Sequence, residues 1–158
     1  MTVIVTNIGV GHDFPGGTID INESWIALSV IDSQGENVFQ TGNLDNELNV
    51  DPNSYFYRSQ AIDRNGQLVW KHDLFNMVGE TYRNTVPAGK SDVVKFAMII
   101  PSWVKGPLTI SAVLKYRKLN QRYAKWALKE QYMDIPVVDL AWDSLVVPVR
   151  EQSSVRNN

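Results

Sequence analysis

Residues 25–35 read WIALSVIDSQG, and this stretch decides the fold. The run from 25 to 31 is apolar and rich in the aromatic and β-branched residues that favour strands. Asp32 and Gly35 then occupy the first and fourth positions of a type I turn, where Asp accepts backbone hydrogen bonds and Gly adopts a left-handed conformation. A second strand-like run, 38–41, follows directly. The stretch therefore predicts a β-hairpin.

The same turn pattern recurs at Asp63 and Gly66, between the apolar runs 55–62 and 68–70. Strand-length runs continue along the chain with Gly, Pro, Asn and Asp between them, which is typical of an antiparallel β protein. Polar segments 43–54 and 72–79 are expected to be long connections. The expected strands are 2–6, 25–31, 38–41, 55–62, 68–70, 93–100, 108–116 and 145–149.

One helix is expected, at 118–129, because four apolar side chains fall near one face at three- and four-residue spacing. They are Leu119, Tyr123, Trp126 and Ala127. The fold class predicted is all-β, an immunoglobulin-like antiparallel sandwich with this short helix. Residues 1–150 are expected to form a single domain and 151–158 a frayed polar tail.

Composition excludes several classes of function. The chain has 158 residues, 44% of them hydrophobic, and a net charge of -2, so it can bury a core but carries no basic field for nucleic acid. It has no cysteine, which excludes disulfides, thiolate catalysis and covalent c-type haem attachment. No signal peptide is visible, and the apolar run 96–101 is much shorter than the ~20 residues that span a bilayer.

The segment 7–20, NIGVGHDFPGGTID, is the most constrained loop, since glycines and a proline alternate with one of the two histidines. His12 is the most ligand-like residue of the chain, because imidazole binds metals and haem iron. The alternative is that its ring hydrogen-bonds a backbone carbonyl and supports the loop. If the loop is an interaction site, Gly11, His12, Phe14 and Pro15 are the residues expected to form it.

Enzyme motifs are absent. A dinucleotide fingerprint would need glycine where Phe14 stands, and there is no phosphate loop, nucleophile elbow or zinc-protease motif. A zinc site would need a third ligand beside His12 and His72, and no spacing supplies one. The chain is therefore expected not to be an enzyme and to hold no metal of its own.

Acidic residues leave calcium open as a minor alternative, although they lack the EF-hand spacing and are more often turn formers. These residues are Asp13, Asp20, Glu23, Asp139 and Asp143.

The five tryptophans admit a second type of site. Trp25 and Trp142 are expected in the core, whereas Trp70, Trp103 and Trp126 lie near predicted element ends where a ring can be partly exposed. Exposed rings suit sugar stacking or a protein interface. An interface predicts an apolar patch near the glycine-rich loop, and sugar binding predicts coplanar rings along one face.

Several motifs together resemble the β-sandwich domain that follows the haem-bearing region of secreted bacterial multihaem c-type cytochromes. The resemblance covers roughly residues 3–130. Its motifs are Asn7-x-x-Val10-Gly11-His12-x-Phe14-Pro15-x-Gly17, Trp25, Asp32-x-x-Gly35, Tyr57-Arg58, Asp63-x-x-Gly66 and Leu114-x-Tyr116-Arg117-Lys118-x-Asn120.

The resemblance implies a periplasmic or extracellular setting and a multihaem c-type cytochrome domain or subunit as partner. The chain departs from those cytochromes because it has no Cys-x-x-Cys-His motif. It is therefore expected to bind no haem covalently. The resemblance puts a role of His12 as an axial ligand to a partner's haem on an equal footing with the loop-supporting role. The expected function is a non-catalytic accessory or interaction domain in an extracytoplasmic electron-transfer assembly, with a carbohydrate-binding or adhesive module as the alternative.

Overall fold

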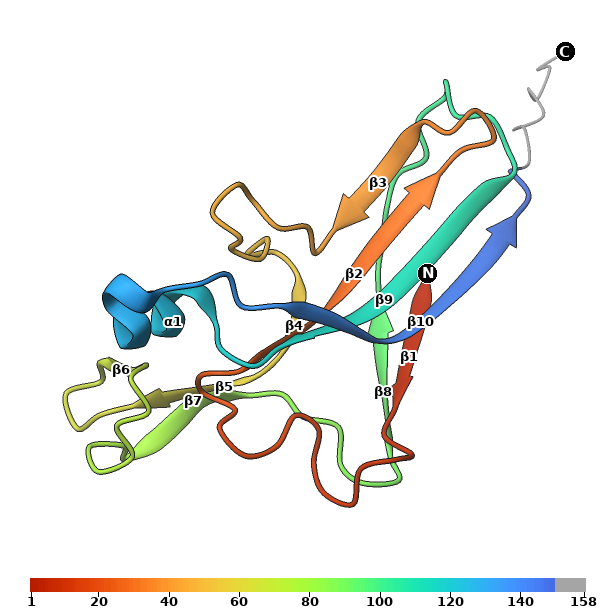
Figure 1. Ribbon diagram of the computed structural model, residues 1–158. Helices are drawn as coiled ribbons and strands as arrows, with labels where there is room; N and C mark the ends of the chain where they lie inside the picture. Colours follow the sequence, from red (N-terminus) through yellow and green to blue (C-terminus); the bar gives the residue numbers. More distant parts are fainter. Residues whose placement is uncertain (150–158) are drawn as a thin grey trace, which may run out of the picture.

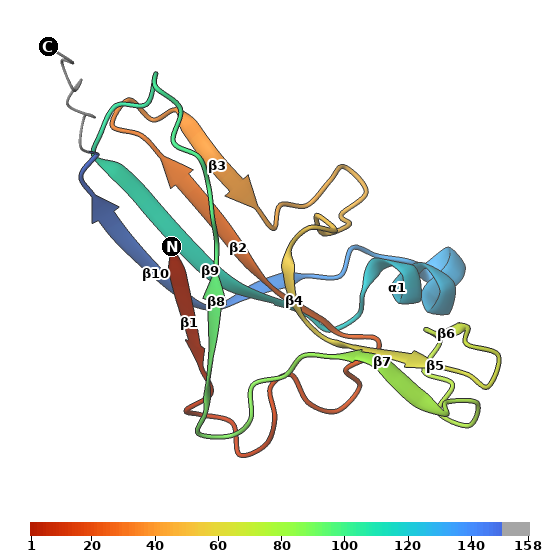
Figure 2. The same cartoon turned by 180° about the vertical axis from the view of Figure 1, so that it is seen from behind.

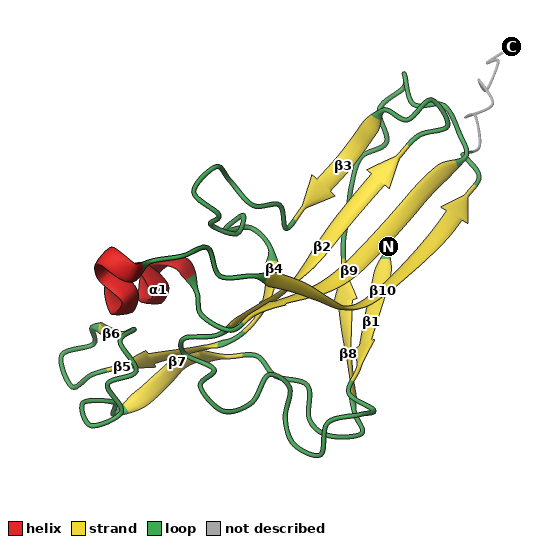
Figure 3. Ribbon diagram, in the orientation of Figure 1, coloured by secondary structure: helices red, strands yellow, loops and turns green. Residues whose placement is uncertain are grey.

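The structure, a computed structural model, describes residues 1–149. It is mostly β, with one α-helix, α1 (Gln121–Leu128), followed by a short 3-10 turn, η1 (Lys129–Gln131) (Figures 1 and 3). The predicted all-β class and the helix expected within 118–129 are confirmed. The predicted tail 151–158 lies outside the described residues. No helix in the described part of the chain is long and apolar enough to cross a membrane.

The strands follow the chain in this order: β1 (Thr2–Thr6), β2 (Glu23–Ile31), β3 (Asn37–Thr41), β4 (Tyr55–Tyr57), β5 (Ser59–Ile62), β6 (Leu68–Val69), β7 (Gly79–Arg83), β8 (Ser91–Lys95), β9 (Leu108–Arg117) and β10 (Val137–Val147).

The main sheet has the strand order β10-β9-β2-β3, and β4 also pairs with β2 (Figure 1). Every pairing is antiparallel, and β2 pairs with β9 over its whole length. Trp25, Ile26, Leu28 and Val30 are fully buried, so both faces of β2 contact other parts of the chain. The apolar run of the sequence is therefore the central strand of the sheet.

Both predicted hairpin turns are present. Gly35 and Gly66 adopt φ of 85° and 75°, and each donates its N–H to the carbonyl oxygen of the Asp three residues earlier. The carboxylates of Asp32 and Asp63 each accept two backbone N–H groups from their own turn, which fixes it, and Asp32 accepts a third from Lys105. The first turn joins β2 to β3 and the second joins β5 to β6.

A second layer covers one face of the main sheet. β1 pairs with β8, and this two-stranded sheet lies across β9 and β2 in both views (Figure 2). Its contact with the main sheet is a cluster of Ile26, Tyr57, Val86 and Val94, against which Val3, Val5, Tyr55, Phe96 and Leu114 pack. The opposite face of β2 packs Trp25 against Val50 and Phe56. The arrangement is sandwich-like.

Two tyrosines of β4 bind one carboxylate of β8. The hydroxyls of Tyr55 and Tyr57 donate to the same Asp92 oxygen, at 2.9 and 3.0 Å. Tyr57 is fully buried, and burial raises the pKa of its phenol far above the usual range, with the Asp92 charge adding to the effect. These bonds hold the two layers together at one point.

The third sheet, β6-β5-β7, extends beside α1 at the end of the molecule opposite the β2–β3 turn (Figure 1). It explains why the expected strand 55–62 is divided. The chain leaves the main sheet after Tyr57 and enters this third sheet at Ser59, so Arg58 belongs to neither strand.

Two other strand expectations were wrong in extent, and one strand was missed. The run 93–100 is a strand only to Lys95, although Phe96 still exchanges two hydrogen bonds with Met1. The expected strand 145–149 begins at Val137, since β10 pairs with β9 along nearly its whole length. β7 was missed, and its first residue had been placed in the connection 72–79.

The predictions for the tryptophans were correct except at Trp142. Trp25 is in the core, as predicted, and its Nε1 donates to the carbonyl oxygen of Gly42 at 2.9 Å. Trp142 is 75% exposed, so its predicted core position was wrong. It lies on β10, which is the edge strand of the main sheet in the described part of the chain. Trp103 and Trp126 are 53% and 40% exposed, as their positions suggested.

Candidate functional site

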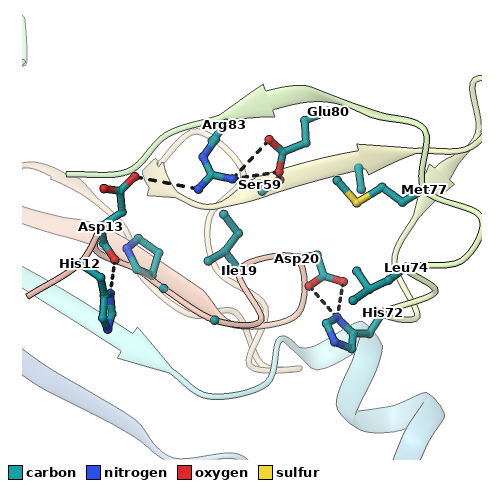
Figure 4. A pocket seen from close by; sticks show the side chains of 14 residues that line it. His12, Asp13, Ile19, Asp20, Ser59, His72, Leu74, Met77, Glu80 and Arg83 are labelled. Atoms are coloured by element: carbon teal, nitrogen blue, oxygen red, sulfur yellow. Dashed lines mark hydrogen bonds and ion pairs between the residues drawn. The ribbon is translucent and has the colours of Figure 1, made fainter. Parts of the chain in front are cut away.

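A cavity of about 550 Å³ opens between the glycine-rich loop 7–20, the strands β5 and β7, and the segment 72–79 (Figure 4). Both histidines of the chain line it. Its apolar lining comes mainly from Ile19, Leu74 and Met77. The cavity therefore combines two imidazoles with an apolar floor.

The side chain of one buried asparagine fixes the glycine-rich loop by hydrogen bonds. The Asn7 side chain donates to the carbonyl oxygens of His12 and Val86, at 2.8 and 2.9 Å, and accepts the N–H of Val10. Phe14 and Val86 exchange two backbone hydrogen bonds. The loop is thus a fixed corner of the fold, as its glycine and proline content predicted.

The four residues expected to form an interaction loop do not share one environment. Gly11 and His12 are exposed, whereas Pro15 is buried and the half-buried Phe14 ring lies 6.2 Å from that of Tyr57. Phe14 and Pro15 therefore anchor the loop, and His12 is an exposed side chain that it carries.

The His12 ring lies over Gly16 and bonds back to its own loop. Its Nδ1 donates to the carbonyl oxygen of Asp13 at 2.7 Å. A Cβ on Gly16 would lie only 2.5 Å from the ring carbon Cε1, so glycine is needed there for the ring to keep this position. The hydrogen bond from Nδ1 to the Asp13 carbonyl oxygen is the one that the loop-supporting role predicts. Nε2, the nitrogen that a ligand role needs, has no hydrogen bond within residues 1–149.

The second histidine is oriented by a carboxylate, which sequence reasoning did not find. Nδ1 of His72 lies 2.9 and 3.1 Å from the two carboxylate oxygens of Asp20 (Figure 4). His72 also has a φ of 56°, uncommon for a residue other than glycine. Asp20 precedes it by 52 residues, so no local sequence signal marks the pair.

An ionic network forms another part of the rim. Arg83 lies 3.3 Å from Glu80 and 4.0 Å from Asp13 (Figure 4). Thr85 also donates to Asp13. Ser59 donates to Glu80 as well. Glu80 and Arg83 lie on β7, a strand that the sequence did not predict. No expected element therefore marked them as residues of a site.

The segment 72–79 beside the cavity exposes apolar side chains. Leu74, Phe75 and Val78 are 58%, 92% and 61% exposed. This is the apolar surface near the glycine-rich loop that an interface role predicts.

Four of the five carboxylates considered for calcium form separate ion pairs, among them Asp13 with Arg83. Asp20 pairs with His72, Glu23 with Arg117, and Asp139 with Lys115. Among the described residues, no group of three His, Asp or Glu side chains lies close enough to hold a metal ion.

The aromatic rings on α1 and just after β6 do not form the flat platform that sugar stacking requires. Trp70 and Trp126 meet edge to face at 75°, and Tyr123 is tilted by 59° against Trp126. Lys71 and Arg122 lie over the Trp70 ring. This cluster joins α1 to β6 and leaves no set of coplanar rings among these residues.

No protein-family model matches the chain, and no curated protein sequence matches it significantly. Among solved structures, the chain is similar to a penta-heme cytochrome c552 from Thermochromatium tepidum, with a TM-score of 0.66 and 15% identity. The match covers 92% of this chain and 35% of the cytochrome, so the chain spans about a third of that protein's length. At this identity the similarity shows a shared fold. Whether the matching region lies C-terminal to the haems stays a prediction.

Proposed function

We propose that this chain is a non-catalytic accessory domain of an extracytoplasmic multihaem cytochrome assembly, and that its glycine-rich loop presents His12 to a haem of the partner. The fold shared with a penta-heme cytochrome supports this role, since the matching part of that protein is large enough to be a domain. The haem belongs to the partner, because this chain has no cysteine for covalent attachment.

The single observation that carries the proposal is the state of the His12 ring. Nδ1 donates to the Asp13 carbonyl oxygen, which places the lone pair of a neutral imidazole on Nε2. That nitrogen has no bond within residues 1–149, and the residue is exposed. An imidazole that binds a metal through one ring nitrogen usually donates a hydrogen bond from the other, and that bond orients the ring. The residues present therefore fit an axial haem ligand.

The surroundings of His12 support the same role. Ile19, Leu74 and Met77 offer an apolar wall to a porphyrin face or edge, and Phe75 and Val78 extend the apolar surface outward. When bound, the haem supplies the electron-transfer chemistry. The chain itself supplies an oriented imidazole, a loop fixed by hydrogen bonds and an apolar surface.

The proposal is tested with a haem c peptide that carries one axial histidine and an open sixth coordination position. Addition of the chain is expected to convert its iron from high to low spin, seen as a shift of the Soret band. His12→Ala should abolish the shift. His72→Ala removes the other imidazole of the same cavity and should retain it. An equal shift with wild type and His12→Ala would exclude His12 as the ligand.

A further inference from the structure

A second cavity, of about 310 Å³, lies on the other side of Asp20, away from His12. Its walls come from the start of β2, the end of β9, the first turn of α1, and the strands β4, β5 and β6. It is thus formed where the main sheet, the third sheet and the helix meet.

Positive charge exceeds negative charge in this cavity. Both acidic side chains that line it are already paired, Glu23 with Arg117 and Asp20 with His72. Arg58 and Arg122 also line it, and neither forms an ion pair with a carboxylate in the described part of the chain. Two guanidinium groups therefore face the cavity without a counter-charge.

Both guanidinium groups are positioned by aromatic rings. The Arg58 guanidinium carbon lies 4.2 Å from the centre of the Phe56 ring, and that of Arg122 lies 3.9 Å from the centre of the Trp70 ring. Contact with a ring face holds the cation in place and does not use its N–H donors. The Nε of Arg58 is buried and has no hydrogen-bond partner in the structure. The donors are therefore in place for an anionic acceptor.

One buried acceptor is also without a partner. Asn22 is only 4% exposed and lines the cavity, and its Oδ1 accepts no hydrogen bond, while its Nδ2 donates to Gly16. A buried carbonyl oxygen without a donor is costly, so a ligand hydroxyl at this point would be favoured. The unpaired groups of the cavity thus call for a carboxylate and a hydroxyl in one small molecule.

We propose that this cavity binds a small hydroxycarboxylate. Arg58 and Arg122 bind its carboxylate, and its hydroxyl donates a hydrogen bond to Oδ1 of Asn22. The site is separate from the His12 cavity and does not depend on haem. The hydroxyl of Ser59, which also lines the cavity, already donates to Glu80, and the role proposed for the site is binding.

The test is isothermal titration of the purified chain with L-malate at pH 7 and low ionic strength, with succinate as the matched ligand that lacks the hydroxyl. Saturable binding at one site is expected, weaker for succinate. Arg58→Gln and Arg122→Gln should each weaken L-malate binding by about tenfold or more, because each removes charged hydrogen bonds. Arg64→Gln changes an exposed arginine in the β5–β6 turn and should have no effect.

Melting temperatures of the variants separate loss of binding from loss of the fold. The proposal is overturned if L-malate does not bind the folded wild-type chain, or if Arg58→Gln and Arg122→Gln bind as well as Arg64→Gln. Equal affinity for succinate and L-malate would contradict the role given to Asn22. Haem propionates carry the same carboxylate group, so metal-free mesoporphyrin IX is the third titrant. Tighter binding of this porphyrin than of L-malate would assign the cavity to a propionate and overturn the proposal of a free hydroxycarboxylate.

Discussion

Nδ1 of His72 donates to both carboxylate oxygens of Asp20, at 2.9 and 3.1 Å, and thereby joins the segment 72–79 to the glycine-rich loop. The Asp20 side chain is 11% exposed and that of His72 33%, so the pair is partly shielded from water. It holds two walls of the His12 cavity at a fixed separation.

Asp20→Ala and His72→Ala are each expected to lower the free energy of unfolding by about 1 kcal/mol, since each removes one side-chain hydrogen bond. The double variant should lose less than the sum, because both changes remove the same interaction. Urea unfolding of the four proteins measures this coupling. Strictly additive losses would mean that the pair does not stabilise the fold.

Glycine substitutions should destabilise in a definite order. At Gly42, φ is 82° and a Cβ would lie 2.6 Å from the Ala27 Cα, so Gly42→Ala is expected to cost about 3 kcal/mol or more. A Cβ at Gly35 or Gly66 would have no atom within 4 Å, but the alanine would keep a positive φ. Each of these two substitutions is expected to lower the free energy of unfolding by about 1 kcal/mol. Gly9→Ala is the control, since no atom lies within 4 Å and its φ is not positive. Urea midpoints in any other order would contradict the turn geometry described above.

Alkaline pH should destabilise the protein through Tyr57. An unfolded tyrosine ionises near pH 10, and burial raises the pKa of Tyr57 in the folded state. Above pH 10 the unfolded chain therefore loses a proton that the folded chain keeps, so stability present below that pH falls as pH rises. Urea midpoints between pH 8 and 11 should fall less steeply for Tyr57→Phe than for wild type. Identical pH profiles would show that Tyr57 does not cause the loss.

The two tryptophans predicted in the core should now behave differently. Trp25→Ala removes a fully buried ring and its hydrogen bond to Gly42, with an expected loss of about 3–5 kcal/mol. Trp142→Ala changes an exposed side chain of an edge strand and should alter stability by about 0.5 kcal/mol or less. Chemical unfolding compares them. A loss at Trp142 similar to that at Trp25 would place Trp142 in a contact that the fold described here lacks.

The sequence was informative where structure depends on neighbouring residues. The turns at Gly35 and Gly66 were predictable because the Asp side chain and the positive-φ glycine act within four residues of each other. The constrained loop around His12 was predictable for the same reason, from its own glycines and proline. In each case the physical cause lies within the quoted segment.

Features that depend on distant pairing were not predictable from one sequence. Trp142 lies in an apolar run, and only the strand order shows that β10 is an edge. The polar strand β7 forms because β5 pairs with it, and the Asp20–His72 pair follows from how the third sheet packs against the loop. The resemblance to multihaem cytochromes identified the fold that the structural comparison supports, and the role of His12 stays a prediction.

The most direct test is the His12→Ala variant measured in two states. The isolated variant should keep a melting temperature close to that of wild type, and its mixture with the haem c peptide should lack the low-spin paramagnetic-resonance signal that wild type and His72→Ala both produce. This result is predicted because Nε2 of His12 has no hydrogen bond within residues 1–149, while Nδ1 donates to the Asp13 carbonyl oxygen. A variant that melts at clearly lower temperature and still gives the low-spin signal would show that His12 supports the loop and does not bind the haem.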